Sequence, residues 1–245
     1  GILMRGDSRS RRESGLADDI EVVFGEVPSV VELEENGVKF LAPVHAGQKT
    51  GWFYDHRMAR ARLAPWVAGK SVLDVYSYIG GWGVQAAAFG AESVTCIDAS
   101  DYALSYVEEN ARLNGVSDKV SCIHGDAFAA CRELRDIREK FDVVIVDPPA
   151  FIPRRKDQKA GELAYQRLNQ LAMRLLSKDG LLVSASCSMH LSKPALVKAV
   201  SLAGQTLEKQ LQIVEQGGQG PDHPIVPAIP ETDYLKSIFV RVLSA

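Results

Sequence analysis

The pattern of hydrophobic and polar positions changes once along the chain. Residues 20–45 alternate between apolar and polar side chains in the way that half-buried strands do, and Asn36-Gly37 separates two of the alternating runs. Asn and Gly both tolerate the positive φ of a type I′ turn, so this pair predicts a β-hairpin. The first part of the chain is therefore expected to form a small antiparallel β module.

Beyond residue 57, strand-like and helix-like runs follow one another. Short apolar strands between amphipathic helices are typical of βαβ units, in which helices cover both faces of a parallel sheet. The last two predicted strands have no long helix between them, so the sheet is expected to end in an antiparallel strand. The predicted strands are 72–76, 93–98, 119–123, 142–147, 180–186, 208–215 and 235–243, and the predicted helices are 57–67, 81–89, 101–113, 126–138, 162–176 and 192–204.

This alternation predicts an α/β fold with a doubly wound, Rossmann-like sheet that is mostly parallel. Residues 1–15 are polar and rich in Arg, which indicates a linker or arm. Residues 16–50 form the β module, and residues 51–245 form the sheet domain. Because the chain begins with Gly rather than Met, we expect it to be either part of a longer protein or a chain with a processing or cloning scar.

Composition narrows the class of protein. The 245 residues are 46% hydrophobic and 24% charged, which is the balance of a soluble globular protein. No apolar run approaches the roughly 20 residues that a membrane-spanning helix needs, and the N-terminus lacks a secretory signal. The four cysteines show no disulfide framework, so a cytoplasmic protein is expected. The net charge of −3 does not exclude nucleic acid, because one basic patch can bind it.

Acidic residues follow three successive predicted strands. In a doubly wound sheet, ligands bind at the carboxyl ends of the strands, where Asp74, Asp98 and Asp126 are expected to lie. A Gly-rich turn at 77–83 lacks both the dinucleotide fingerprint and the P-loop pattern. Three carboxylates beside a Gly-rich turn suit a nucleoside with a cationic tail better than a negatively charged pyrophosphate. The alternative is that Asp98 and Asp126 only cap the helices that follow them.

These motifs resemble those of class I S-adenosylmethionine-dependent methyltransferases. The resemblance is carried by VLDVYSYIGGWG, SVTCIDAS, GDAF and FDVVIVDPPAF. More narrowly, the chain is similar to the 23S rRNA cytosine-5 methyltransferases, in GQKTGWFYDHR at 47–57, SCS at 186–188 and DHP…PETDYLKS at 222–237. That family usually begins with a small RNA-binding PUA domain, which this sequence lacks, and residues 16–50 match only the latter part of its central module.

The resemblance implies that S-adenosylmethionine is the cofactor and S-adenosylhomocysteine its product. Asp74 and Gly80 would hold the methionine end, Asp98 the ribose, and Asp126 with Ala127 the adenine. It also implies an RNA substrate, with 23S rRNA the expected one, and it allows a homodimer. The residues implied to bind the cofactor are Lys49, Asp55, Arg57, Asp74, Tyr76, Ser77, Tyr78, Gly80, Asp98, Ala99, Ser100, Asp126, Ala127, Asp147 and Pro148.

Two motifs at neighbouring strand ends suit methylation of carbon 5 of cytosine. That carbon is a poor nucleophile until a thiolate adds to carbon 6, so the reaction needs a Cys, an acid near ring nitrogen 3 and a pocket for the base. Cys187, in SCS, is the candidate nucleophile, and Asp147, which opens DPPAF, is the candidate acid. The alternative for Cys187 is an inert core thiol, which is the interpretation we favour for Cys96, Cys122 and Cys131.

Substrate contacts are predicted around the same loop. Arg154 and Arg155, with nearby lysines, form a basic patch that would contact RNA phosphates, although a solvated surface loop is the alternative. Phe151 and Pro149 are candidates to contact the target base, and His223 to shape its pocket.

Other functions remain open at this level. Methylation of an exocyclic amine uses a Pro-Pro-aromatic step, whereas Ala150 intervenes here, and an amine would not require a Cys. A catalytically silent RNA-binding scaffold could share the fold. No zinc deaminase motif is present, and no metal site is expected.

Overall fold

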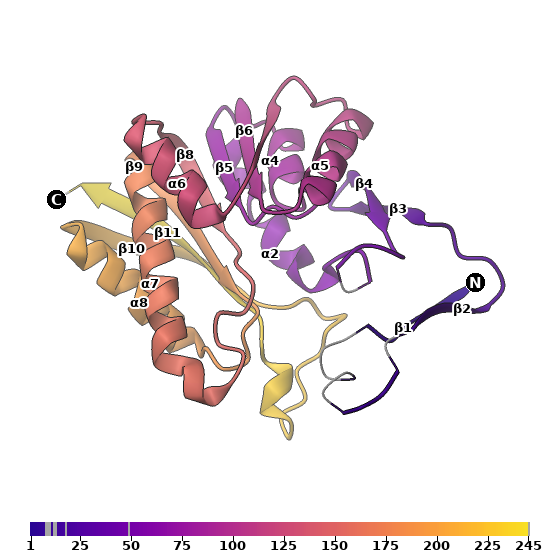
Figure 1. Ribbon diagram of the computed structural model, residues 1–245. Coiled ribbons are helices and arrows are strands. Elements are labelled where there is room, and N and C mark those ends of the chain that lie inside the picture. The colour runs from indigo at the N-terminus through magenta and orange to yellow at the C-terminus, as the bar shows by residue number, and fades with distance from the viewer. Residues whose placement is uncertain (8–10, 12–13, 18, 49, 245) are drawn as a thin grey trace. The chain divides into compact units, whose positions relative to one another are not determined.

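The structure is a computed structural model that describes residues 1–7, 11, 14–17, 19–48 and 50–244. The chain forms two compact units, Gly1–Tyr54 and Asp55–Ala245, of which the second carries the main sheet (Figure 1). In the described part of the chain, no helix is long and apolar enough to cross a membrane.

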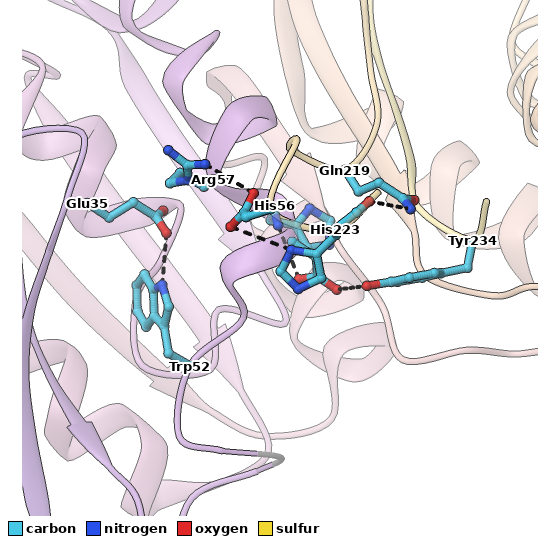
Figure 2. A network of polar contacts seen from close by, with 9 residues as sticks. Glu35, Trp52, His56, Arg57, Gln219, His223 and Tyr234 are labelled. Atoms are coloured by element: carbon cyan, nitrogen blue, oxygen red, sulfur yellow. Dashed lines mark hydrogen bonds and ion pairs between the residues drawn. The ribbon is translucent and has the colours of Figure 1, made fainter. Parts of the chain in front are cut away.

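The first unit contains two separate two-stranded sheets. Strands β3 (Val30–Glu35) and β4 (Val38–Pro43) pair antiparallel. Asn36 (φ 55°) and Gly37 (φ 78°) connect them in the left-handed conformation, which confirms the predicted hairpin. A small core supports it, because Trp52 packs on Phe40 at 4.4 Å between ring centroids and donates a 2.8 Å hydrogen bond to Glu35 (Figure 2).

The prediction of a linker over residues 1–15 is wrong for its beginning. Ile2–Arg5 form strand β1, which pairs antiparallel with β2 (Ile20–Phe24), so β2 pairs with this strand and not with β3. The Arg5 side chain explains part of this order, because it donates to the Asp7 carboxylate and to the carbonyl oxygens of Val44 and Gly47. The sequence interpretation placed Arg5 in a linker or arm.

The second unit is built on a seven-stranded sheet of order β10-β11-β9-β8-β5-β6-β7. Neighbouring strands from β9 to β7 are parallel, whereas β11 runs antiparallel to both β9 and β10. The predicted antiparallel last strand is thus confirmed. The strands are β5 (Ser71–Val75), β6 (Ser93–Asp98), β7 (Val120–His124), β8 (Phe141–Val146), β9 (Leu176–Ser186), β10 (Lys209–Gly217) and β11 (Lys236–Ser244).

Helices cover both faces of this sheet (Figure 1). The winding reverses at β5, so α4 and α5 cover one face while α6, α7 and α8 cover the other, with α7 and α8 side by side. Fully buried aliphatic side chains of β5, β8 and β9 fill the space beneath the second group. The helices are α4 (Gly83–Ala88), α5 (Asp101–Leu113), α6 (Ala127–Asp136), α7 (Gln158–Leu175) and α8 (Lys193–Thr206).

One predicted helix, 57–67, is in fact two. Helix α2 (Arg57–Ala61) ends before α3 (Ala64–Val67) begins. Pro65 lies in the first turn of α3, and because proline has no N–H to donate to the preceding turn, it interrupts the helical hydrogen bonds. The short helix η1 (Tyr54–His56) precedes α2.

Candidate active site

A strained turn follows β5 at the centre of the sheet. Tyr76 (φ 67°), Tyr78 (φ 50°) and Gly80 (φ 86°) all adopt the left-handed conformation. A side chain at Gly80 would also lie 2.7 Å from a methyl carbon of Val84, so both its φ and its surroundings require glycine. Non-glycine residues held in this region cost about 1–3 kcal/mol each, and such strain concentrates at ligand sites.

Asp74 supports this turn from beneath. It is fully buried, and its Oδ2 accepts a 2.8 Å hydrogen bond from the N–H of Gly83 at the start of α4. Burial raises the pKa of Asp74 to about 7, with smaller contributions from Asp147 and Asp98, against the lowering effects of the Gly83 N–H and the Arg60 guanidinium. The family resemblance implies that Asp74 holds the methionine end of the cofactor, and in the structure one of its two oxygens is engaged by the N–H of Gly83.

Asp98 is held in a fixed orientation at the end of β6. Its Oδ2 accepts the N–H of Tyr78 at 2.8 Å, and its Oδ1 accepts the N–H of Ser100 at 2.9 Å. Ser100 caps α5, while Ala99 is exposed and its carbonyl oxygen lies 3.1 Å from Nε2 of His124. Because a carboxylate has about four acceptor positions, Asp98 retains capacity for two further donors.

Asp126 caps a helix, as the alternative interpretation proposed. It is exposed, and its Oδ1 accepts the N–H of Ala129 in the first turn of α6. The neighbouring Gly125 donates its N–H to the Asp98 carbonyl oxygen at 3.0 Å, which ties the ends of β6 and β7 together. Ala127 is buried, and capping engages only one of the two oxygens of Asp126.

Asp147 follows β8 and is the first residue of the DPPAF loop. Its side chain connects this loop to the turn that follows β5. Its Oδ2 accepts a 3.0 Å hydrogen bond from the indole N–H of Trp82 and lies 3.3 Å from Nε2 of His56, which is 3% exposed. Sequence reasoning missed this role of His56, although the residue lies between Asp55 and Arg57, which were both singled out. No motif in the sequence indicates that His56 and Asp147 meet.

Two serines fix the loop that carries Cys187. Ser186 Oγ lies 2.8 Å from the hydroxyl of Tyr165 on α7 and accepts the N–H of Ser188 at 3.1 Å. The hydroxyl of Ser188 donates to the carbonyl oxygen of Ile152, just beyond DPPAF. The half-buried Cys187 therefore lies between two anchored neighbours.

The other thiols differ from Cys187 in their surroundings. Burial raises the pKa of Cys122 to about 11 and that of Cys131 to about 12, and it also raises the pKa of Cys96. Thiols with such values carry little thiolate at neutral pH, so these three are poor nucleophiles.

Phe151 belongs to an aromatic cluster. Its ring centroid lies 4.9 Å from that of Tyr165, 6.3 Å from that of Phe128 and 6.4 Å from that of Tyr76. It is half-buried and packs against the core beneath α7, so much of its surface is already covered.

The beginning of β11 also lies at this edge. Lys236 pairs with Ser186 across the two strands, and its ammonium donates to the carbonyl oxygens of Ser188 and Leu191 at 2.6 and 2.5 Å. Nearby, Tyr234 donates a 2.9 Å hydrogen bond to the buried Asp55. An antiparallel strand begins at the edge where its parallel neighbours end. The prediction of an antiparallel last strand therefore could have indicated that residues at the start of β11 lie at the site.

A polar network surrounds His223 (Figure 2). Arg57 donates to Asp222 at 3.0 Å, and Nδ1 of His223 lies 3.5 Å from the other oxygen of Asp222. The Gln219 amide donates to the carbonyl oxygens of His223 and Thr232, which fixes this loop.

The remaining predicted residues are more dispersed. Arg154 pairs with Asp157 at 3.1 Å and stays largely exposed, as do Arg155 and Pro149. Pro148 and Ser77 are buried. Lys49 lies outside the described residues.

Comparison with known proteins identifies the family. Residues 8–240 match the S-adenosylmethionine-dependent methyltransferase family. The chain belongs to this family. It is 37% identical over 243 residues to ribosomal RNA large subunit methyltransferase I of Shewanella denitrificans, and 38% identical over 242 residues to that of Aeromonas salmonicida. Both alignments cover 98% of this chain but 61% of the relative, so the chain spans about three fifths of their length.

Among solved structures, a protein from Streptococcus mutans classed as a SAM-dependent methyltransferase superposes with a TM-score of 0.81. The match covers 91% of this chain and 58% of the other at 23% identity, and it supports the fold.

The geometry at the sheet edge fits the cofactor of the family. S-adenosylmethionine presents ribose hydroxyls, which suit the remaining acceptor positions of Asp98, and a nucleoside needs the close backbone approach that the 76–80 turn allows. The buried Oδ1 of Asp74 has no hydrogen-bond partner among the described residues, so an acceptor is also available below the turn.

Proposed function

We propose that this methyltransferase methylates carbon 5 of a cytosine in RNA, with Cys187 as the nucleophile. The observation that carries the proposal is the position of Cys187, which follows β9 at the same sheet edge as the turn and is fixed to the DPPAF loop through Ser188 and Ile152. Cys187 directly follows the end of β9, whereas Cys96 and Cys122 lie within β6 and β7 and Cys131 within α6.

The thiolate of Cys187 would add to carbon 6 of the cytosine, forming a carbon–sulfur bond while ring nitrogen 3 takes a proton. Carbon 5 then has enamine character and attacks the methyl group that S-adenosylmethionine supplies when bound. Loss of the proton from carbon 5 restores the double bond between carbons 5 and 6 and expels the thiolate, while ring nitrogen 3 returns its proton to the acid. The products are 5-methylcytosine, S-adenosylhomocysteine and one proton, and the thiolate and the acid are regenerated.

Asp147 is the proposed acid at ring nitrogen 3. Trp82 and His56 both contact its Oδ2, and the other oxygen takes no part in these two contacts. The contacts of Oδ2 with Trp82 and His56 fix the orientation of this carboxyl group beside the proposed base pocket.

The cofactor would be held by the turn and the strand ends. We assign the ribose to Asp98, the adenine side to Asp126 with Ala127, and the methionine end to the turn that Asp74 and Gly80 shape. Tyr76, Tyr78 and Ser100 line the same edge.

The proposed RNA substrate is supported by the relatives, which are named for methylation of large-subunit ribosomal RNA. The exposed guanidinium groups of Arg154 and Arg155 follow the DPPAF loop and suit phosphate contacts. We therefore propose 23S rRNA as the substrate.

The decisive experiment combines the protein with methyl-labelled S-adenosylmethionine and unmodified 23S rRNA, followed by digestion to nucleosides. We expect label in 5-methylcytidine with the wild type and with Cys122→Ala, which removes a thiol within β7, and no label above background with Cys187→Ala. Label on an exocyclic amine, or transfer that survives Cys187→Ala, would contradict the proposal.

A second substrate tests the adduct directly. With RNA that contains 5-fluorocytidine, carbon 5 has no proton to lose after methyl transfer, so the thiolate cannot be expelled. We expect a protein–RNA complex that survives denaturing electrophoresis with the wild type and Cys122→Ala, and none with Cys187→Ala. Absence of the complex in an active wild type would rule out the covalent route.

A further inference from the structure

Lys236 is a buried cation without a carboxylate partner. Its exposed fraction is 5%, and among the described residues no carboxylate forms an ion pair with it. Its ammonium hydrogen bonds instead go to the carbonyl oxygens of Ser188 and Leu191. Burying a charged group costs desolvation free energy unless an opposite charge compensates it. A negative charge near this ammonium would therefore stabilise the folded protein.

The hydrogen bonds of Lys236 fix the turn directly behind Cys187. Strand pairing sets Lys236 opposite Ser186, and the two carbonyl oxygens that it binds lie one and four residues beyond Cys187. The same turn is fixed from the other side by Ser188 and Ile152. The ammonium therefore contacts the backbone that carries the thiol.

The charges around this thiol come from several elements. Burial lowers the pKa of Lys236 to about 8, while the negative charges of Cys187 and Asp233 act in the opposite direction. Tyr165 on α7 also interacts with Cys187 and Asp147, and burial raises its pKa to about 12. Burial and the hydrogen bond to Asp55 raise the pKa of Tyr234 as well. Both phenols are thus neutral at physiological pH, and His190 lies within the turn itself.

We propose that Lys236 is a positioning residue for methyl transfer, which fixes the 188–191 turn and stabilises the thiolate of Cys187. The thiolate is the reactive form of cysteine, and a cation hydrogen-bonded to the carbonyl oxygen of the next residue, Ser188, favours that form. The thiolate in turn supplies the negative charge that the buried ammonium lacks. The link to methyl transfer rests on the proposed function, whereas the effect on the thiol does not.

The test measures the thiol itself. Cys187 would be alkylated with iodoacetamide from pH 6 to pH 10, and the rate would be followed by mass spectrometry of the peptide that contains it. We expect Lys236→Met to raise the apparent pKa of Cys187 and to slow its alkylation about tenfold at pH 7. Lys236→Arg keeps the charge and should retain a rate within about threefold of the wild type.

Lys193→Met is the matched control, because it removes an exposed cation at the start of α8, just beyond the same turn. It should alkylate like the wild type. If Lys236→Met also alkylates like the wild type, the inference is wrong. If Lys236→Met does not fold, the pH dependence of alkylation in the wild type is the test. A Cys187 pKa at or above the ordinary thiol value of about 8.5 would overturn the inference.

The two proposals fail in different ways. If Lys236→Met slows alkylation, the effect of Lys236 on the thiolate is supported. If Cys187→Ala still transfers methyl groups in the same series, the covalent mechanism is wrong. If Cys187→Ala is inactive and Lys236→Met is alkylated at the wild-type rate, the covalent mechanism is supported and the proposed effect of Lys236 on the thiolate is wrong.

Discussion

The cofactor side and the chemistry side of the sheet edge are built in different ways. At the ends of β5 and β6, contacts within one βαβ unit shape the site: Asp74 with Gly83, and Asp98 with Tyr78 and Ser100. At the ends of β8, β9 and β11, partners far apart in sequence meet. Trp82 reaches Asp147, and Lys236 reaches the turn after Cys187. The cofactor side needs only two consecutive strands and the turn between them, whereas the chemistry side needs strands and loops from distant parts of the chain.

This difference separates binding from chemistry. Changes on the cofactor side should weaken cofactor affinity, and changes on the chemistry side should slow methyl transfer while the cofactor still binds. The substitutions at Asp98 and Trp82 test whether the two effects separate in this way.

The largest effect is expected at Asp98. Asp98→Ala removes the acceptor of two backbone N–H groups and the proposed ribose ligand. Hydrogen bonds to a charged group contribute about 1.5–3 kcal/mol, so affinity for S-adenosylhomocysteine should fall about 100-fold by titration calorimetry. Asp101→Ala, in the exposed first turn of α5, is the control, and Cys187→Ala should bind normally. Equal loss of affinity in Cys187→Ala would show that the two sides are not separate.

The same difference explains what the sequence could predict. The strand ends, the Gly-rich turn and the Asn36-Gly37 hairpin depend on neighbours in the chain, and the periodicity and turn chemistry located them. Helix α5 was predicted with its observed bounds, because Ser100 caps it and Asn114-Gly115 ends it.

Long-range contacts were beyond such reasoning. Nothing local in the sequence indicates that His56 lies against Asp147, or that Tyr165 binds Ser186. The pairing of Ile2–Arg5 with β2 was missed for the same reason, since Arg5 is anchored by carbonyl groups about forty residues away. The sequence identifies the residue types at the site, but their supports depend on the register of distant strands.

The second prediction concerns the stability of the protein without cofactor. The pKa of Asp74 is raised in the folded state from 3.8 to about 7, so the folded protein binds the extra proton and its stability falls as pH rises from about 4 to 7. Asp74→Asn keeps an acceptor for Gly83 without a charge. At pH 8 it should be more stable than the wild type by up to about 4 kcal/mol in urea unfolding, and the gain should vanish near pH 4.

Asp142→Asn provides the contrast, because hydrogen bonds from Ser71 and Ser177 and the charge of Lys70 outweigh burial and lower the pKa of this carboxyl. Its loss should destabilise the protein at pH 8. A gain from Asp74→Asn that is the same at pH 4 and pH 8 would show that the charge of Asp74 is not its cause.

Trp82 connects the two sides, because it lies in the turn and donates to Asp147. Trp82→Phe keeps an aromatic ring beside His56 but removes the N–H, so kcat for methyl transfer should fall about tenfold with the affinity for S-adenosylhomocysteine unchanged. Trp66→Phe is the control, since the buried indole N–H of Trp66 has no hydrogen-bond partner among the described residues. A fall in affinity instead of kcat would assign Trp82 to the cofactor side.

The smallest effect is expected at Tyr165, whose hydroxyl anchors Ser186 on the chemistry side. Tyr165→Phe preserves the ring contact with Phe151 and removes one neutral hydrogen bond, which contributes about 1 kcal/mol. The melting temperature should fall by about 3 °C, and methyl transfer should slow by less than the Trp82 variant does, because Ser188 still anchors the loop to Ile152. Tyr102→Phe, on the exposed face of α5, should melt like the wild type. If Tyr165→Phe instead abolished transfer without a change in melting, the hydroxyl would act on the reacting groups, and the chemistry side would extend to α7.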